Sequence, residues 1–120
     1  MNNKDEEITQ LTLLWYHIIR SDHHKDRDCH WAIEKVWSYG NIPKYIVRHD
    51  GYVYERFTKE FDTYFYAQNF LISKIKNAIE GKRKWARHIL NLKEKDKEEY
   101  EFNVELAEEI MKLLKEYNYD

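Results

Sequence analysis

The segment that decides the fold is CHWAIEKVWSYGNIPKYIVRHDGYVYERF, residues 29–57, in which apolar and polar residues alternate over most of the length. An alternation of period two places successive side chains on opposite faces of a β-strand. The dipeptides Gly40-Asn41 and Asp50-Gly51 interrupt this alternation, and both are typical of turns. The segment therefore predicts three antiparallel strands connected as a meander.

The second predicted hairpin depends on Asp50-Gly51. Both residues tolerate the positive φ angles of a two-residue type I′ turn. Such a turn would pair His49 with Tyr52 and Val47 with Tyr54. We therefore expect the third strand to begin directly after Gly51.

The first hairpin has two competing registers, and the burial of aromatic side chains decides between them. A loop over residues 39–43 places Trp37 opposite Tyr45 and Glu34 opposite Arg48, and it separates aromatic from charged residues. The aromatic face then contains Trp31, Ile33, Trp37, Tyr45, Val47, Tyr52 and Tyr54. The opposite face contains His30, Ala32, Glu34, Lys44, Arg48 and Glu55, with Val36, Ile46, Val53 and Phe57 as apolar exceptions.

Helical periodicity flanks the strands on both sides. Apolar residues at helical spacing predict a first helix over about residues 5–20 and a second over residues 61–81. Asp62 or Thr63 is suited to cap the second helix, and Gly81 is suited to end it. These two helices are expected to cover the aromatic face of the sheet.

The C-terminal part of the chain predicts further helices. Residues 82–92 predict a third helix, residues 93–99 its solvated end or a linker, and residues 103–118 a fourth helix capped by Asn103. The expected fold class is α+β, with an α-β-β-β-α core over residues 1–80 and a helical extension over 81–120 in the same domain.

Composition limits the class of protein. The chain has 120 residues, 42% of them hydrophobic, a net charge of −2 and one cysteine. These values predict one folded domain without an internal disulfide, and the net charge provides no attraction of the whole chain for nucleic acid or anionic membranes. The sequence has no apolar run of about 18 residues, and its first ten residues, MNNKDEEITQ, are acidic and polar, so we expect neither a membrane span nor a secretory leader. We expect a soluble cytoplasmic protein that makes no membrane contact.

The segment SDHHKDRDCHW, residues 21–31, concentrates side chains that bind metals. The candidate ligands in and near it are His17, His23, His24, Cys29 and His30. Their spacing matches neither C-x-x-C nor H-E-x-x-H, and neighbours on a strand such as Cys29 and His30 point to opposite faces. We expect a solvated connection and no cofactor, with a metal site as an alternative.

The segment GKRKWARH, residues 81–88, is the strongest indication of nucleic-acid binding. Basic side chains beside an aromatic ring are typical of surfaces that bind a phosphate backbone and stack on bases. The candidates are Lys82, Arg83, Lys84, Trp85 and Arg87. In the alternative interpretation Trp85 is part of the core and the basic side chains are only solvated.

The last predicted helix has an apolar stripe at Val104, Ile110, Met111 and Leu114. Because the earlier helices suffice to cover the sheet, part of this stripe is expected to lack an intramolecular partner and to bind a protein or a second copy of the chain. Three isolated glycines form no phosphate loop, and no catalytic constellation is evident. The leading expectation is a non-catalytic protein-interaction or regulatory module.

Overall fold

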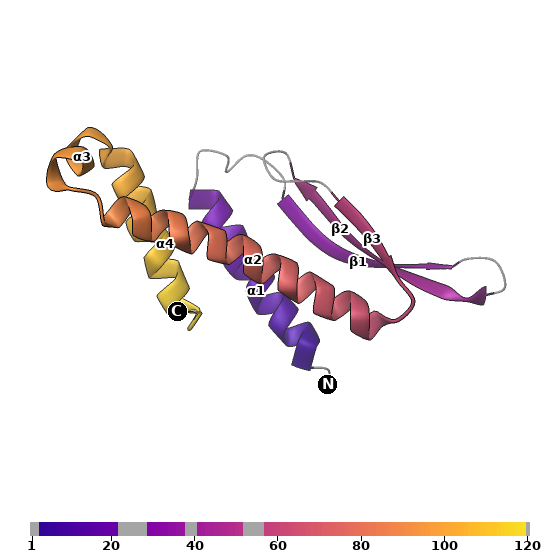
Figure 1. Cartoon of the computed structure of the whole chain (residues 1–120). Coiled ribbons are helices and arrows are strands. Elements are labelled where there is room, and N and C mark those ends of the chain that lie inside the picture. Colours follow the sequence, from indigo (N-terminus) through magenta and orange to yellow (C-terminus); the bar gives the residue numbers. More distant parts are fainter. Residues whose placement is uncertain (1–2, 22–28, 38–40, 52–56, 120) are drawn as a thin grey trace.

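In the computed structural model, a three-stranded sheet and four helices form an elongated molecule with principal extents of 64 × 28 × 19 Å (Figure 1). The structure describes residues 3–21, 29–37, 41–51 and 57–119. In chain order the elements are α1 (Asn3–Ser21), β1 (Cys29–Trp37), β2 (Pro43–Gly51), β3 (Phe57–Phe61), α2 (Tyr64–Leu90), α3 (Glu94–Glu99) and α4 (Glu101–Glu116). The predicted α+β class, with helices packed on an antiparallel sheet, is confirmed.

The predicted faces of the first two strands are correct. The strands follow the order β1-β2-β3 and are antiparallel, with Ile33 opposite Val47 and Trp31 opposite His49. Val47 is fully buried, and Trp31, Ile33 and Tyr45 pack against the same core. The aromatic face of β1 and β2 therefore lies under the helices at Trp31, Ile33, Tyr45 and Val47, whereas the predicted member Trp37 is exposed. The predicted members Tyr52 and Tyr54 lie outside the described residues.

The predicted register of the first hairpin is wrong by two residues. Trp37 pairs with Pro43, and Glu34 pairs with Ile46 instead of Arg48. Arg48 is the diagonal neighbour of Glu34, and their side chains still form an ion pair with an Nη2–Oε2 distance of 3.3 Å. A shift of two residues leaves every side chain on its original face, so the separation of apolar from charged residues cannot distinguish these two registers.

The turn predicted at Asp50-Gly51 is also wrong. Both residues belong to β2 and pair with the first two residues of β1. On the other side of β2, His49 pairs with Phe57, and Val47 pairs with Lys59. Pairing along the full length of β1 thus outweighs the local turn preference of Asp-Gly. Phe57 consequently occupies a register position on the face opposite to the predicted one.

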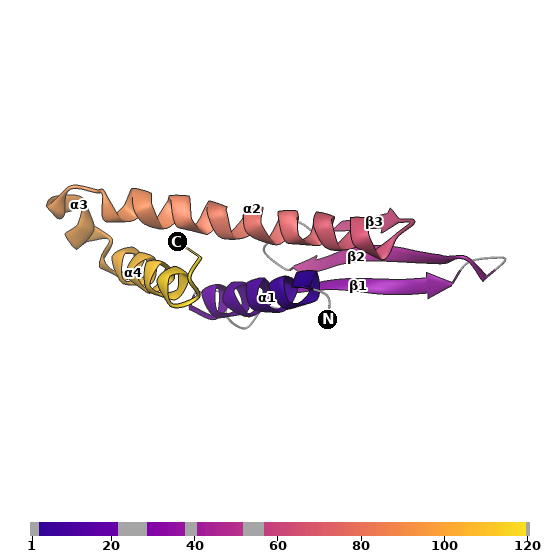
Figure 2. The same ribbon diagram turned by 90° about the horizontal axis from the view of Figure 1, so that it is seen from below.

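Figure 2 shows α4 and α1 one after the other alongside α2. α1 and the N-terminal half of α2 cover the sheet, whereas α4 packs beyond the sheet on the C-terminal half of α2. The core residues are Leu11, Leu14, Trp15, Ile18, Ile19, Val47, Ala67, Leu71, Ile72, Ile75, Ile79, Ala86, Ile89, Leu106, Ala107, Ile110, Leu113 and Leu114. One continuous core therefore joins the sheet to the C-terminal helix.

Helix α2 passes through Gly81, where the sequence predicted a break. Ile79 and Ala86 are buried on the same helix on either side of Gly81, and their packing maintains the helix. A Cβ atom at Gly81 would meet nothing within 4 Å, so this glycine faces open space. At the other end, the predicted cap by Thr63 is confirmed, because its Oγ1 accepts a hydrogen bond of 3.2 Å from the Tyr66 backbone N–H.

The C-terminal helix begins before its predicted cap. α4 starts at Glu101, and its N-cap is Tyr100 instead of Asn103. The preceding α3 is short and buries none of its residues. After α4, the Tyr119 hydroxyl donates a 3.3 Å hydrogen bond to the Lys76 carbonyl, which fixes the chain end against the middle of α2. Among the described residues, no helix has the length and apolar character needed to cross a bilayer.

Candidate functional site

The predicted metal ligands are not brought together in the described part of the chain. His17 is exposed on α1, with its ring 5.6 Å from that of Tyr16 and 5.9 Å from that of Tyr117. Cys29 and His30 are consecutive at the start of β1, and His23 and His24 lie outside the described residues. No group of three His, Cys, Asp or Glu side chains suited to a metal ion occurs among the residues that the structure describes.

The predicted basic stretch forms part of α2, and its residues divide into two groups. The Arg83 guanidinium pairs with Glu80 and lies 5.6 Å from the centroid of the Tyr119 ring, while Trp85 is half-buried against the core. Lys84 is exposed on the surface of the helix. Lys82 is half-buried and Arg87 is exposed. Arg83 and Trp85 therefore contribute to packing, whereas the side chains of Lys84 and Arg87 are exposed.

The apolar stripe of α4 is largely internal. Ile110 and Leu114 have 1% and 0% of their surface exposed, and Val104 and Met111 are half-buried. Ile110 and Leu114 therefore pack inside the molecule, and the prediction that part of the stripe binds a partner is left to Val104 and Met111. The physical reason is the length of α2, because a helix that continues past Gly81 provides α4 with a packing surface beyond the sheet.

A surface that sequence reasoning missed lies at the sheet end of the molecule. The hairpin of β1 and β2 extends past the N-terminus of α2, so the helices leave its tip uncovered (Figures 1 and 2). Trp37 and Ile42 on this hairpin are 61% and 59% exposed. We call this part of the molecule the aromatic end, and its exposed large apolar side chains are Val36, Trp37, Ile42, Tyr64, Phe65 and Tyr66.

The base of the hairpin is fastened to the start of α2. Lys44 of β2 forms an ion pair with Asp62, and this hydrogen bond together with the carboxylate charge raises the pKa of Lys44. The rings of Tyr45 and Tyr64 lie 5.5 Å apart. These two contacts join β2 to the residues immediately around the Thr63 cap, so they fix where the hairpin leaves the helices.

The start of α1 is fastened to the same place through Asp5. The Tyr64 hydroxyl and the Gln68 side-chain amide donate hydrogen bonds of 2.8 and 2.7 Å to one oxygen of the Asp5 carboxylate. Burial raises the pKa of Tyr64, and the hydrogen bond to Asp5 adds to this effect. Gln68 is 1% exposed, so this contact reaches into the core. The carboxylate thereby holds the two helix N-termini together beside the hairpin.

Lysines lie over aromatic rings throughout this half of the molecule. Lys35 Nζ is 4.7 Å from the centroid of the Trp37 ring, and Lys4 Nζ is 5.0 Å from that of Phe65. Lys59 Nζ lies 4.8 Å from the centroid of the neighbouring Phe70 ring. A cation over an aromatic face is favourable and keeps positive charge next to apolar surface. The aromatic end therefore suits a ligand that combines apolar groups with carboxylates.

One feature of the sequence could have indicated this surface. Tyr64, Phe65 and Tyr66 are consecutive at the start of α2. Successive residues of a helix point about 100° apart, so three aromatic side chains in a row cannot all enter one core. In the structure Phe65 and Tyr66 are 54% and 60% exposed.

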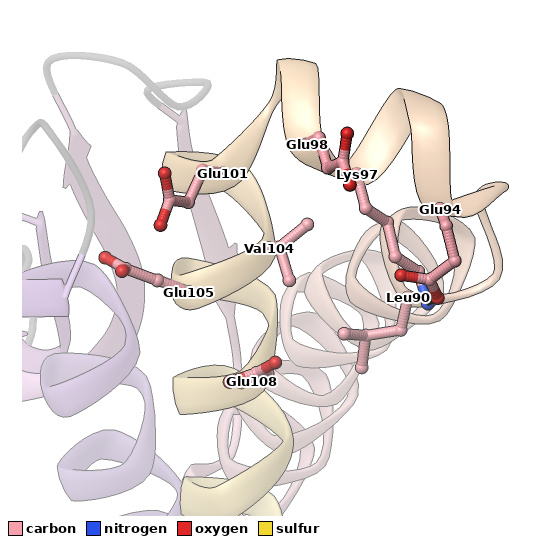
Figure 3. Close-up of a pocket in the computed structure, with 8 residues that line it drawn as sticks. All are labelled: Leu90, Glu94, Lys97, Glu98, Glu101, Val104, Glu105 and Glu108. Carbon is pink, nitrogen blue, oxygen red and sulfur yellow. Dashed lines mark ion pairs between the residues drawn. The ribbon is translucent and has the colours of Figure 1, made fainter.

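A groove of about 550 Å³ lies at the opposite end of the molecule, where α2, α3 and α4 meet (Figure 3). We call it the acidic groove, and its lining consists of Leu90, Glu94, Lys97, Glu98, Glu101, Val104, Glu105 and Glu108. Five of these residues are glutamates and one is a lysine, whose Nζ lies 3.6 Å from Glu94 Oε1. Leu90 and Val104 provide apolar surface between the carboxylates of α3 and α4.

Comparison with known proteins adds nothing to these observations. No family model, curated protein or solved structure matches this chain. Three features of the described residues therefore bear on function, namely the aromatic end, the basic stretch and the acidic groove. The aromatic end combines aromatic rings with lysines, and the acidic groove combines apolar residues with glutamates. Surfaces that combine apolar and charged side chains are suited to binding.

Proposed function

We propose that this protein is a small, non-catalytic protein-interaction module that binds its partner through the aromatic end. The observation that carries this proposal is the 61% exposure of Trp37 on a hairpin that extends beyond the covering helices. Tryptophan is enriched among the residues that dominate binding energy at interfaces. Five further large apolar side chains are exposed at the same end of the molecule, and exposed apolar surface of this extent is typical of interaction sites.

The base of the hairpin that carries Trp37 is held in place before a partner docks, and this supports binding. The ion pair of Lys44 with Asp62 and the contact of Tyr45 with Tyr64 hold the base of the hairpin against α2. A surface already held in one geometry loses less conformational entropy when a partner docks. The hairpin can therefore present its apolar side chains at a low entropic cost.

The chemistry of the partner follows from the lysines on the rings. Lys35 beside Trp37 and Lys4 beside Phe65 place positive charge around apolar surface. We propose that the partner contributes a segment with apolar side chains and carboxylates. Such a segment would bury the rings and pair with the ammonium groups. We place this interaction in the cytoplasm, where a chain with one cysteine needs no disulfide for stability.

The test is selection from a displayed library of random peptides against the full-length chain. We expect the selected peptides to be acidic and apolar. Their affinity should fall at least about tenfold for Trp37→Ala, as expected for a residue at the centre of an interface. Thermal unfolding of Trp37→Ala should change little, because exposed side chains contribute little to stability.

Tyr100→Ala is the matched control, since Tyr100 is also a large exposed aromatic residue but lies between α3 and α4. Peptides that bind Trp37→Ala as tightly as the parent chain would refute the proposed function. A library that yields only basic peptides, insensitive to Trp37, would also refute it.

Nucleic-acid binding is the second candidate, and the composition of α2 favours it. This helix carries six Lys and Arg residues against one Glu, although the whole chain is slightly acidic. Binding of a labelled oligonucleotide would have to weaken steeply between about 50 and 200 mM salt. It would also have to disappear on reversal of Lys84 and Arg87, which are the exposed members of the basic stretch.

A further inference from the structure

Opposite charges are concentrated side by side at the end of the molecule away from the sheet. The basic stretch, defined by Lys82, Arg83, Lys84 and Arg87, occupies the last turns of α2. The acidic groove begins at Leu90 of the same helix and contains five glutamates. Leu90 is three residues, and therefore about one helical turn, beyond Arg87. Arg83 pairs with Glu80 and Lys82 is half-buried, so Lys84 and Arg87 are the exposed cations of the stretch, and they precede the negative groove on the same helix.

Such a surface is complementary to itself. In a dimer with a twofold axis, both subunits use the same patch. A residue on one side of the axis contacts a residue on the other side of the patch in the partner subunit, and the reverse contact occurs as well. A patch that is positive on one side and negative on the other satisfies this condition when the axis passes between the two sides. Here that boundary lies between Arg87 and Leu90.

From this arrangement we infer that the acidic groove binds the basic stretch of a second copy of this chain. In this dimer Lys84 and Arg87 of each subunit lie over the glutamates of the partner subunit. The apolar surface of Leu90 and Val104 is covered near the axis. The dimer therefore contains two identical contacts, each between the acidic groove of one subunit and the basic stretch of the other.

Charge complementarity favours a second copy over an unrelated partner. One chain supplies both halves of the contact, and its net charge of −2 produces little repulsion between two copies. The contact is rich in charge and poor in apolar area, so its affinity should depend strongly on salt. This surface lies at the opposite end from Trp37, so the dimer and the proposed partner site do not compete.

The test uses two charge-reversal variants of the full-length chain in sedimentation experiments. One variant is Lys84→Glu with Arg87→Glu, and the other is Glu98→Lys with Glu105→Lys. All four side chains are exposed, so both variants should fold as the parent does by circular dichroism. We expect the parent chain to be dimeric at low salt and each variant alone to be monomeric, with dimerisation weakened by at least about tenfold.

Mixing the two variants gives the decisive result. In a mixed pair, the reversed basic stretch of one subunit meets the reversed groove of the other, and the second contact is between unaltered surfaces. Both contacts are attractive, so an equimolar mixture should form dimers although neither variant does alone. Reversal of Lys112 and Lys115, which are exposed elsewhere on α4, should leave the parent dimer intact.

Three outcomes would overturn the inference. A parent chain that is monomeric at low salt and high concentration excludes the dimer. A mixture that stays monomeric, while the parent is dimeric, excludes this pairing of surfaces. A monomeric parent chain that binds a labelled oligonucleotide through Lys84 and Arg87 would assign the basic stretch to nucleic acid instead. None of these outcomes affects peptide binding at Trp37, which tests the proposed function separately.

Discussion

The two ends of the molecule present different kinds of surface on the same helix. At the N-terminus of α2, aromatic rings are exposed and lysines lie over them. At its C-terminus, the exposed side chains are mainly charged, with Lys84 and Arg87 on the helix and five glutamates around the acidic groove. An aromatic surface gains binding energy mainly from burial of apolar area, which salt affects little. A charged surface binds with a specificity that comes from charge complementarity, and its affinity depends on the salt concentration.

The internal contacts of the two ends differ in the same way. The aromatic end is fastened by hydrogen bonds to Asp5 and by the ion pair of Lys44 with Asp62. The charged end is held by apolar packing of α4 on α2, with Ile110 and Leu114 buried. Hydrogen bonds and an ion pair thus hold the aromatic end in place, whereas the packing of buried apolar side chains holds the charged end in place. Substitutions at each end should therefore affect stability by different mechanisms.

The largest expected effect is that of Leu114→Ala. Leu114 is 0% exposed, and its removal leaves a cavity between α4 and α2. We expect the free energy of unfolding to fall by about 2–5 kcal/mol, measured by urea unfolding with circular dichroism. Lys112→Ala on the exposed side of α4 is the control and should change it by less than about 0.5 kcal/mol. Because both ends share α2, unfolding should remain one transition, and two separated transitions would show that the ends unfold independently.

The next effect in size is that of Asp5→Ala at the aromatic end. The substitution removes the carboxylate that accepts hydrogen bonds from Tyr64 and the buried Gln68. We expect a loss of about 1–3 kcal/mol in urea unfolding, because a buried donor loses an acceptor. The control is Glu6→Ala, which removes another carboxylate from the first turn of α1. Equal losses in the two variants would mean that Asp5 acts only through its charge at the helix terminus.

A smaller effect of opposite sign is expected for Gly81→Ala, in the part of α2 between the two ends. A Cβ atom there meets nothing within 4 Å, and alanine favours a helix more than glycine does. Thermal unfolding should show a gain of about 0.5–1 kcal/mol. A loss of stability would indicate that the helix is bent or packed differently at this position.

The smallest effect concerns two tyrosines, Tyr64 at the aromatic end and Tyr119 beside the middle of α2. Burial, reinforced by Asp5, raises the pKa of Tyr64, and burial, reinforced by Glu80, raises the pKa of Tyr119. The fold therefore holds both phenols in the protonated form. The resulting stability is present below the ordinary tyrosine pKa of about 10 and is lost as pH rises through the higher folded value. Ultraviolet titration should show a late ionising group that disappears in Tyr64→Phe, and another that disappears in Tyr119→Phe. Phenols that ionise together with those of the unfolded chain would contradict this assignment.

Sequence reasoning identified α1, β1, β2, the start of α2 and the C-terminal helix, together with the faces of the first two strands, because these depend on local periodicity. It placed the third strand directly after Gly51 and a separate helix after Gly81, whereas β3 is Phe57–Phe61 and α2 continues to Leu90. It failed where two arrangements share the same periodicity. The registers that place Glu34 opposite Arg48 or opposite Ile46 have identical faces, so only the loop and the packing decide between them. Similarly, Asp50-Gly51 is a strong local signal for a turn, but the pairing of β1 along all of β2 is a non-local effect.

The candidate sites were harder to predict because exposure depends on where each element ends. Gly81 was expected to end a helix, so the surface that α2 offers to Ile110 and Leu114 was not foreseen. The exposure of Trp37 arises because the hairpin is longer than the helix layer above it, and no local pattern reports that difference. The acidic groove combines residues of three helices whose relative placement follows from the same long α2.

The unbroken course of α2 also has a geometric consequence. A helix of 27 residues is about 40 Å long, and it connects the start of the aromatic end directly to the first residue of the acidic groove. Because a helix resists stretching and bending, α2 acts as a ruler that sets a constant spacing between these surfaces. Two copies joined at their charged ends would hold their tryptophans at a fixed separation. Such a pair would select partners that carry two binding segments at the same separation as the two tryptophans.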